Sequence, residues 1–161
     1  MNYANQLMKQ SRSVRALLVG AVALFSLQIT TAHAAVPGII APGSTFNLTA
    51  SADYLTAPDG AMIYSWGYGC SPGFAPSFLP TTVDFPAGNC PLMQLPGPTM
   101  IVHEGDTVTV NLTNSLPVAA GNTSMLFPGF NVTTTGGVAG QLTTEATPAS
   151  GATLGLPVTY T

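Results

Sequence analysis

The chain has 161 residues, a length that suits one domain with a sizeable core, and only 6% of them are charged. All three of its basic residues, Lys9, Arg12 and Arg15, lie near the N-terminus, whereas its six acidic residues follow from Asp53 onward. This distribution excludes nucleic-acid binding, which depends on Lys and Arg at phosphates, and attraction to an anionic membrane surface.

Residues 1–34 have the order of a secretory signal peptide. The basic residues precede the apolar run "ALLVGAVALFSL", and the small-residue pattern Ala32-His33-Ala34 follows. The apolar run has about 12 residues, too few for the roughly 20 that span a bilayer. We therefore predict cleavage after Ala34 and a secreted or periplasmic domain at 35–161.

Two cysteines, Cys70 and Cys90, remain after that cleavage. An oxidising compartment favours a disulfide, which would tether the intervening segment rich in Pro and Gly. The alternative is a metal site, but this spacing lacks a CxxC and a nearby His and matches no zinc pattern.

The remaining sequence predicts short strands separated by turns. Strands are expected at "FNLTASA" (46–52), "AMIYSW" (61–66) and "TSMLF" (123–127), with a turn at "APDG" (57–60). The clearest strand covers 107–113, where Val108, Val110 and Leu112 alternate with polar residues. "GGVAG" (136–140) is expected to be a flexible turn, and a last strand begins near Val158 and leaves an open edge.

No segment outside residues 1–34 has helical periodicity over ten residues or more. The prediction is therefore an all-β, Greek-key β-sandwich. Because the chain stops at "VTYT", inside an expected strand, the fold is expected to be incomplete at the C-terminus, as in a truncated domain.

The segment "LPGPTMIVHEGDTVTVNLTNSLP" (95–117) resembles the first plastocyanin-like (cupredoxin) domain of multicopper oxidases. The positions that fit the pattern are Pro96, Gly97, Pro98, Thr99, Gly105, Asp106, Val108, Val110 and Asn114. Gly105 can take a positive φ, and Asp106 can cap the turn by accepting backbone N–H groups. Glu104 and Asp106 could also be read as catalytic carboxylates, but turn formation is the preferred interpretation.

The same resemblance places "NTSMLFPGF" (122–130) where the family carries a His-x-His pair that binds copper. Here Leu126 and Pro128 occupy the two histidine positions, while Gly129 still fits the frame. Neither side chain has a lone pair for a metal. "LFPG" resembles a divergent exported subgroup that includes manganese-oxidising enzymes, in which the ligands sit in other domains. We therefore expect an apolar wall at 125–130, copper in the full-length family, and none bound by this chain alone.

Few other residues could carry chemistry. His103 is the sole imidazole after residue 34 and is expected to be exposed at a strand end. Met62, Met93, Met100 and Met125 could bind copper(I), but they are scattered in the sequence, so packing is the preferred role. No catalytic residue is predicted.

The sequence thus favours a structural first domain of an exported multicopper oxidase-like protein, in contact with the remaining cupredoxin domains of the same or a longer protein. Alone, it is not expected to be active. One alternative is a stand-alone exported β-sandwich that binds a partner through its open edge or acidic face. Another is an oxidase component that receives copper ligands from a second chain.

Overall fold

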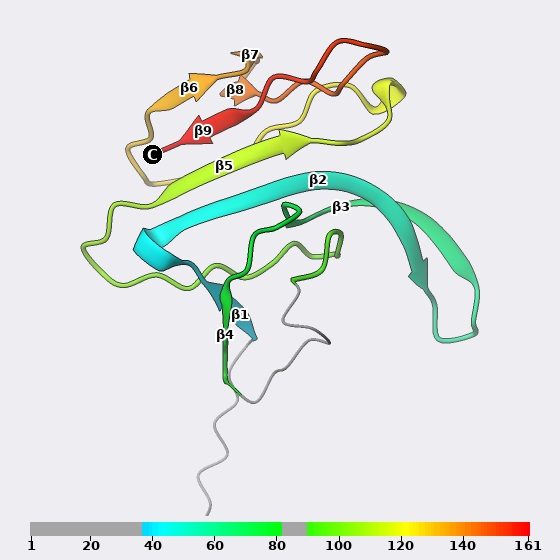
Figure 1. Cartoon of the computed structure of the whole chain (residues 1–161), viewed down its shortest axis with the longest axis horizontal. Coiled ribbons are helices and arrows are strands. Elements are labelled where there is room, and N and C mark those ends of the chain that lie inside the picture. The colour runs from blue at the N-terminus through cyan, green and yellow to red at the C-terminus, as the bar shows by residue number, and fades with distance from the viewer. Residues whose placement is uncertain (1–36, 82–89) are drawn as a thin grey trace, which may run out of the picture. The chain divides into compact units, whose positions relative to one another are not determined.

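The computed structural model describes residues 37–81 and 90–161, which are nearly all β (Figure 1). The predicted signal peptide, residues 1–34, lies outside these residues. The described residues form no α-helix, only the 3-10 turns η1 (Pro42–Ser44) and η3 (Val118–Ala120). None of their helices is long and apolar enough to cross a membrane.

The main sheet has five strands in the order β3-β2-β5-β9-β6. Their bounds are β2 (Thr45–Thr56), β3 (Met62–Cys70), β5 (Thr109–Asn114), β6 (Thr134–Gly136) and β9 (Val158–Tyr160). β2 pairs with β3 antiparallel and with β5 parallel, and this second pairing joins strands far apart in the sequence. Two small pairs complete the fold: β1 (Gly38–Ile40) with β4 (Ser77–Leu79), and β7 (Val138–Ala139) with β8 (Thr144–Glu145).

One face of the main sheet forms the core. The alternation predicted around Leu112 is confirmed, and the neighbouring strands add side chains to the same face, all buried: Phe46, Leu48, Val110, Leu112, Val158 and Tyr160. Burial of each such apolar side chain contributes roughly 1.5–3 kcal/mol. The opposite face is polar, where Asn111 Nδ2 donates to Asn47 Oδ1 over 2.8 Å and Thr159 Oγ1 donates to Asn111 Oδ1 over 2.7 Å.

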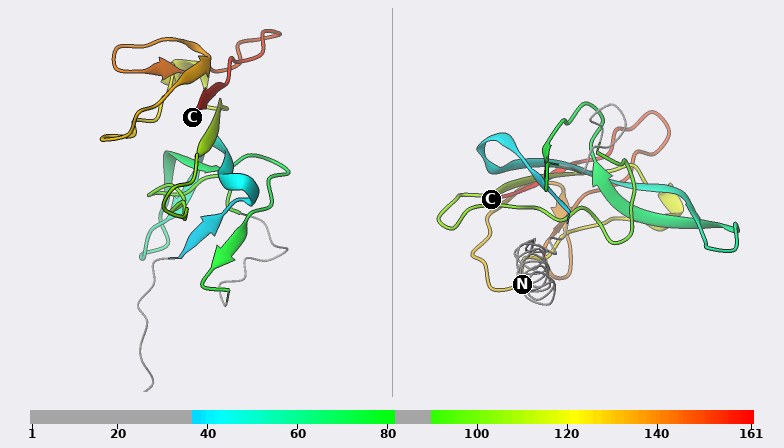
Figure 2. Two further views of the ribbon diagram at one scale, coloured as in Figure 1. Left: turned by 90° about the vertical axis from the view of Figure 1, so that its left-hand side faces the viewer. Right: turned by 90° about the horizontal axis from the view of Figure 1, so that it is seen from below.

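A second layer covers the core face. β1 and β4 lie side by side and away from β6–β8 (Figures 1 and 2). Ile39 of β1 is buried in the core, and its N–H donates to Thr99 O over 2.8 Å while Ile101 N–H donates to Ile39 O over 2.9 Å. The two layers confirm the predicted class, an all-β sandwich.

The predicted disulfide between Cys70 and Cys90 is present, with an S–S distance of 2.02 Å, and both cysteines are buried. The chain after Cys90 lies against β3, because Cys70 N–H donates to Pro91 O over 2.9 Å and Gln94 N–H donates to Tyr68 O over 3.1 Å. Gly69 permits this close approach, since a Cβ there would lie 2.2 Å from the Leu92 carbonyl carbon. The bridge therefore anchors the returning chain to the edge of the sheet.

Three predictions about strands were wrong. Residues 123–127 form no strand, and only Thr123 pairs, in an isolated bridge with Ala146. "GGVAG" is not a flexible turn, because Gly136 ends β6 and Val138–Ala139 forms β7. Gly136 and Gly137 have φ of +80° and +56°, and these positive values let the chain change direction between the two strands.

The third correction concerns the last strand. β9 was expected to leave an open edge, but it lies inside the sheet between β5 and β6. Thr133 and Thr161 exchange two backbone hydrogen bonds of 2.7 and 2.9 Å just beyond the paired residues. The partner strand, β6, ends at Gly136, the first residue of the segment that the sequence pattern assigned to a turn.

Candidate functional site

The segment 122–130, which the sequence resemblance aligns with copper ligands, packs against the core through Met125 and Phe127 and is held by two tyrosines. The Tyr68 hydroxyl lies 2.6 Å from Thr123 Oγ1 and also donates to Ser124 O over 3.3 Å. Met125 N–H donates to the Tyr160 hydroxyl over 3.2 Å, and this hydroxyl donates to Thr144 O over 2.8 Å. The tyrosine hydroxyls thus satisfy two backbone groups of the segment, Ser124 O and Met125 N–H, which have no partner in a sheet ladder.

Side chains of this segment divide between core and solvent. Met125 and Phe127 pack against the core, and the Phe127 ring lies 5.6 Å from the Tyr160 ring in a tilted arrangement. Leu126 is 54% exposed and Phe130 is 78% exposed. Gly129, with φ of +85°, forms the turn between them, and Phe130 N–H donates to Phe127 O over 3.2 Å. The predicted apolar wall is therefore confirmed for Met125 and Phe127 and wrong for Leu126 and Phe130, which are exposed.

The residues at this segment do not fit a copper centre. Leu126 and Pro128 occupy the two ligand positions of the resembled pattern, and neither side chain has a donor atom. Across residues 37–81 and 90–161, no group of three or more His, Cys, Asp or Glu side chains is placed to hold a metal ion. His103 is exposed and lies 3.7 Å from the Asp106 carboxylate. Met93, Met100 and Met125 are buried or partly buried, whereas Met62 is exposed.

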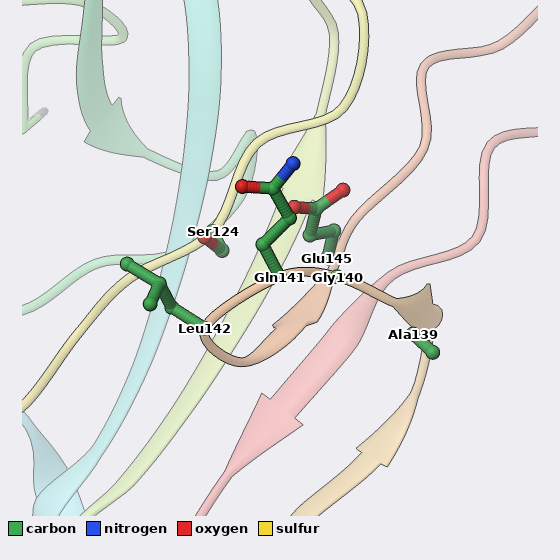
Figure 3. A pocket seen from close by; sticks show the side chains of 6 residues that line it. All are labelled: Ser124, Ala139, Gly140, Gln141, Leu142 and Glu145. Atoms are coloured by element: carbon green, nitrogen blue, oxygen red, sulfur yellow. The ribbon is translucent and has the colours of Figure 1, made fainter.

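A hollow lies beside the segment, between Ser124 and the loop from β7 to β8 (Figure 3). Its lining residues are Ser124, Ala139, Gly140, Gln141, Leu142 and Glu145. The Gln141 amide and the Glu145 carboxylate project to the same side of the loop (Figure 3), and Glu145 Oε2 accepts a hydrogen bond of 3.2 Å from Asn122 Nδ2. A single carboxylate with amide neighbours can accept hydrogen bonds, but it lacks the paired nucleophile and base that covalent catalysis needs.

The Gly105-Asp106 turn has the structural role that the sequence predicted. Gly105 has φ of +90°. Asp106 Oδ2 accepts hydrogen bonds from Ser44 Oγ over 2.7 Å and from His103 N–H over 3.1 Å. The Ser44 bond, followed by the His103 backbone bond, lowers the pKa of Asp106 below 3.8. A lowered pKa means that this contribution to stability is present above pH 3.8 and is lost as the pH falls through the lowered value.

The other residues of the family pattern also hold the fold. A Cβ at Gly97 would lie 3.2 Å from Tyr68 Cβ, and Thr99 O accepts the hydrogen bond from Ile39. Pro96 lies in a bend, and Pro98 lies in the irregular stretch that follows it. Asn114 is buried: its Nδ2 donates to Gly121 O over 3.0 Å and to Ala146 O over 3.1 Å, and its Oδ1 accepts from Leu116 N–H over 3.0 Å.

Comparison with known proteins agrees with this description. Residues 93–159 match the family model of multicopper oxidase, a range that contains the Gly105-Asp106 turn, Asn114 and the segment 122–130. No curated protein and no solved structure matches the chain. The match and the all-β architecture together define a cupredoxin-like β-sandwich. Its residues 93–159 are similar to a multicopper oxidase domain.

Sequence reasoning missed the two tyrosines that fix the segment. Tyr68 and Tyr160 both lie on the core face, where a hydroxyl group needs a hydrogen-bond partner once it is buried. The sequence contains only a weak signal for this role. A tyrosine at an inward-facing strand position indicates that its hydroxyl needs a hydrogen-bond partner, but it does not indicate which distant backbone group that partner is.

Replacing Tyr160 with Phe is expected to reduce the free energy of unfolding by about 1–3 kcal/mol, because Met125 N–H and Thr144 O lose their partner. Burial raises the pKa of Tyr160 above 10.0, so wild-type stability should fall as the pH rises above that value, and less so in Tyr160→Phe. Urea unfolding followed by circular dichroism measures both effects. The control is Tyr54→Phe at an exposed position, where we expect a change below about 0.5 kcal/mol. Equal stability of the two variants would contradict the role of Tyr160.

Proposed function

We propose that this chain is the first cupredoxin-like domain of an exported multicopper oxidase-like protein and that its role is architectural. One observation carries the proposal. A domain similar to multicopper oxidases over residues 93–159 has Leu126 and Pro128 on an exposed surface, and we assign these two residues to the positions of the family's copper ligands on the sequence resemblance. Such a surface can contact a protein but cannot coordinate copper.

The exposed apolar residues support contact with further cupredoxin domains. Leu126 and Phe130 flank the Pro128-Gly129 turn. Phe130 N–H donates to the Phe127 carbonyl, and the residue before Leu126, Met125, donates its N–H to the Tyr160 hydroxyl. A rigid apolar surface loses little conformational entropy on association, so it suits a permanent interface. Copper-dependent oxidation coupled to dioxygen reduction then belongs to the longer protein, with the metal held by other domains.

Export is supported by two independent features. The order of residues 1–34 is typical of a signal peptide, and the Cys70–Cys90 disulfide suits an oxidising compartment. We place the mature domain in the periplasm or outside the cell.

The absence of a copper site is tested by metal loading. The exported chain is incubated with Cu²⁺, or with Cu⁺ under anaerobic conditions, then desalted, and bound copper and visible absorption are measured. We expect far less than one copper per chain and no blue absorption band. A Leu126→His/Pro128→His variant serves as a sensitivity control, because two imidazoles supply donors and should retain more copper. One copper per wild-type chain would overturn this part of the proposal.

The architectural role is tested on the coding region. Sequencing beyond the Thr161 codon distinguishes a reading frame that continues into further copper-ligand motifs from one that stops. In the first case, Leu126→Asp or Phe130→Asp in the complete product should impair domain assembly and oxidase activity while leaving export intact. A stop codon would instead favour the second candidate function, a stand-alone exported binding module, for which the exposed β2–β3 hairpin provides a surface.

A further inference from the structure

The β2–β3 hairpin extends beyond the main sheet. β2 pairs with β3 from Leu48↔Cys70 to Thr56↔Met62, but it pairs with β5 only from Thr45 to Ala50. Residues 51–67 therefore form a two-stranded ribbon, here called the arm, which curves away past the end of β5 (Figure 1). A two-stranded hairpin is marginally stable in water unless one face packs against something.

One face of the arm continues the core face of the sheet. The cross-strand pairs Tyr54↔Tyr64, Thr56↔Met62 and Ala52↔Trp66 share a side with Leu48 and Ala50, because alternate residues of a strand face the same way. Along this face lies the aromatic strip, defined here as Tyr54, Met62, Tyr64 and Trp66.

The aromatic strip is open to solvent, although the same face is buried within the sheet. Tyr54, Met62, Tyr64 and Trp66 are 55%, 61%, 51% and 48% exposed, whereas Leu48 and Ala50 are buried. The covering segment meets this face at Tyr68, whose hydroxyl contacts Thr123 and Ser124. Beyond Tyr68, no part of the chain that the structure describes buries the strip. The Tyr54 and Tyr64 rings lie 5.4 Å apart in a tilted arrangement, which holds them in position.

The residue types of the strip are those of a protein-binding surface. The centres of protein interfaces are enriched in Tyr, Trp and Met and depleted in Lys, Glu and Asp. Aromatic residues at such centres carry a large share of the binding energy because they bury much area at a small entropic cost.

Charge decides which partner fits. Asp53 and Asp59 are exposed on the arm, at the opposite face and in the turn, and residues 16–161 contain neither Lys nor Arg. A second copy of this chain would carry the same acidic side chains and no Lys or Arg after residue 15 to pair with them, which disfavours self-association. A neutral sugar could stack on the rings and donate hydroxyl hydrogen bonds to a carboxylate at its edge, but it would gain no charge attraction from an acidic chain, and Asp53 lies on the face opposite the rings. An apolar protein surface flanked by Lys or Arg gains from both features.

We propose that the aromatic strip of the arm docks onto a protein surface whose apolar patch is flanked by basic residues. The same surface chemistry is required whether that partner lies in the same polypeptide or in another, so the inference does not depend on the proposed function. Docking would bury the face that the described residues, 37–81 and 90–161, leave open and would complete the packing of the hairpin.

Trp66 is the single tryptophan of the chain, so its fluorescence reports directly on the strip. The exported chain is titrated with a synthetic peptide of alternating Leu and Lys, a matched peptide of alternating Leu and Glu, and a neutral β-1,4-glucan oligosaccharide. We expect a saturable shift of Trp66 emission to shorter wavelength with the Leu-Lys peptide alone, weakening as salt is added. Equal binding of the Leu-Glu peptide, or a shift with the glucan alone, would overturn the proposal.

Variants locate the binding to the arm. Tyr54→Ser/Tyr64→Ser should weaken binding of the Leu-Lys peptide at least about tenfold. Asp53→Asn/Asp59→Asn should slow association at low salt and reduce its salt dependence. The matched control is Leu154→Ser, which removes an 85% exposed leucine from the loop before β9 and should leave binding unchanged. Wild-type affinity of the double tyrosine variant would contradict docking through the strip.

Circular dichroism and thermal unfolding verify that each variant is folded. If the double tyrosine variant unfolds, Met62→Ser is used in its place, because Met62 is the most exposed residue of the strip. Its affinity for the Leu-Lys peptide should also fall, and an unchanged affinity would again count against the proposal.

Discussion

Asn114→Ala is expected to lower the free energy of unfolding by about 3–5 kcal/mol, the largest effect of any single polar substitution proposed for this chain. The Asn114 side chain joins the end of β5 to three places: Gly121 O, Ala146 O and Leu116 N–H. Alanine leaves all three groups without that partner at a buried position, and each unsatisfied group costs about 1–3 kcal/mol unless water reaches it. Urea unfolding followed by far-UV circular dichroism measures the loss.

The matched control is Asn111→Ala on the same strand. Asn111 faces the polar side of the sheet, where its partners Asn47 and Thr159 are half-buried and open to water. We expect a loss of about 1 kcal/mol or less, because water replaces the missing amide. Equal losses for the two alanine variants would show that the position of Asn114 has no special importance.

Asn114→Asp separates hydrogen bonding from shape. Aspartate keeps the acceptor for Leu116 N–H but places an oxygen against the carbonyls of Gly121 and Ala146. Its stability should therefore be as low as that of the alanine variant at neutral pH and should partly recover in acid, where a protonated carboxyl donates again. Full wild-type stability at neutral pH would contradict the donor role of Nδ2.

Local sequence patterns predicted the strands in which apolar and polar residues alternate and the turns that have characteristic turn residues. Val108, Val110 and Leu112 alternate with polar residues. Val110 and Leu112 are buried on the core side of β5, and Val108, just before the strand, packs against the same core. Gly105 and Asp106 are turn residues by chemistry that does not depend on distant contacts. Both predictions hold because the information lies within a few residues.

The errors arose where distant residues decide the structure. The apolar segment 123–127 resembled a strand, but its backbone bonds go to single distant partners: Thr123 pairs with Ala146, Ser124 O accepts from the Tyr68 hydroxyl, and Met125 N–H donates to the Tyr160 hydroxyl. Those bonds also determine which side chains point outward. The sequence alone shows that the side chains of Leu126 and Pro128 have no atom that can bind a metal. It does not show that the Leu126 side chain is exposed, because distant contacts determine that.

The arm shows the same limit of sequence reasoning. "AMIYSW" reads as an ordinary strand with an apolar face, and it does form part of β3. Whether that face is buried depends on how much of β2 is paired with β5. This pairing ends at Ala50, although β2 itself continues beyond that residue. The lengths of neighbouring strands, rather than the residues of "AMIYSW", leave Tyr64 and Trp66 exposed.

Removing the disulfide with Cys70→Ala/Cys90→Ala is expected to cost about 3 kcal/mol. The bridge closes a loop with a sequence separation of 20, and the loss of that closure frees the unfolded chain by about this amount. Both cysteines are also buried in the core cluster, so alanine adds a small packing loss. Unfolding of the wild type with and without reductant, compared with the double variant, measures the effect.

The loss should be local before it becomes global. The chain after Cys90 is held to β3 by the bonds at Pro91 and Gln94 and to β2 by Ser51 Oγ, which donates to Leu92 O over 2.7 Å. These contacts lie at the base of the arm. Without the bridge, amide hydrogen exchange should accelerate at Cys70 and Gln94, or at their replacements, more than in β5, because only the former depend on the returning chain.

Two outcomes would contradict this role of the bridge: a stability change below about 1 kcal/mol on reduction, or acceleration of exchange spread evenly over β5 and β9. The cysteine-free variant is the control for reductant, which should leave it unchanged. If the bridge stabilises the domain by about 3 kcal/mol, the stability of the domain depends on the compartment, because a chain that stays in a reducing cytosol lacks the disulfide and its contribution. The weakened region would be the base of the arm, so docking through the aromatic strip is expected to require the oxidised, exported form.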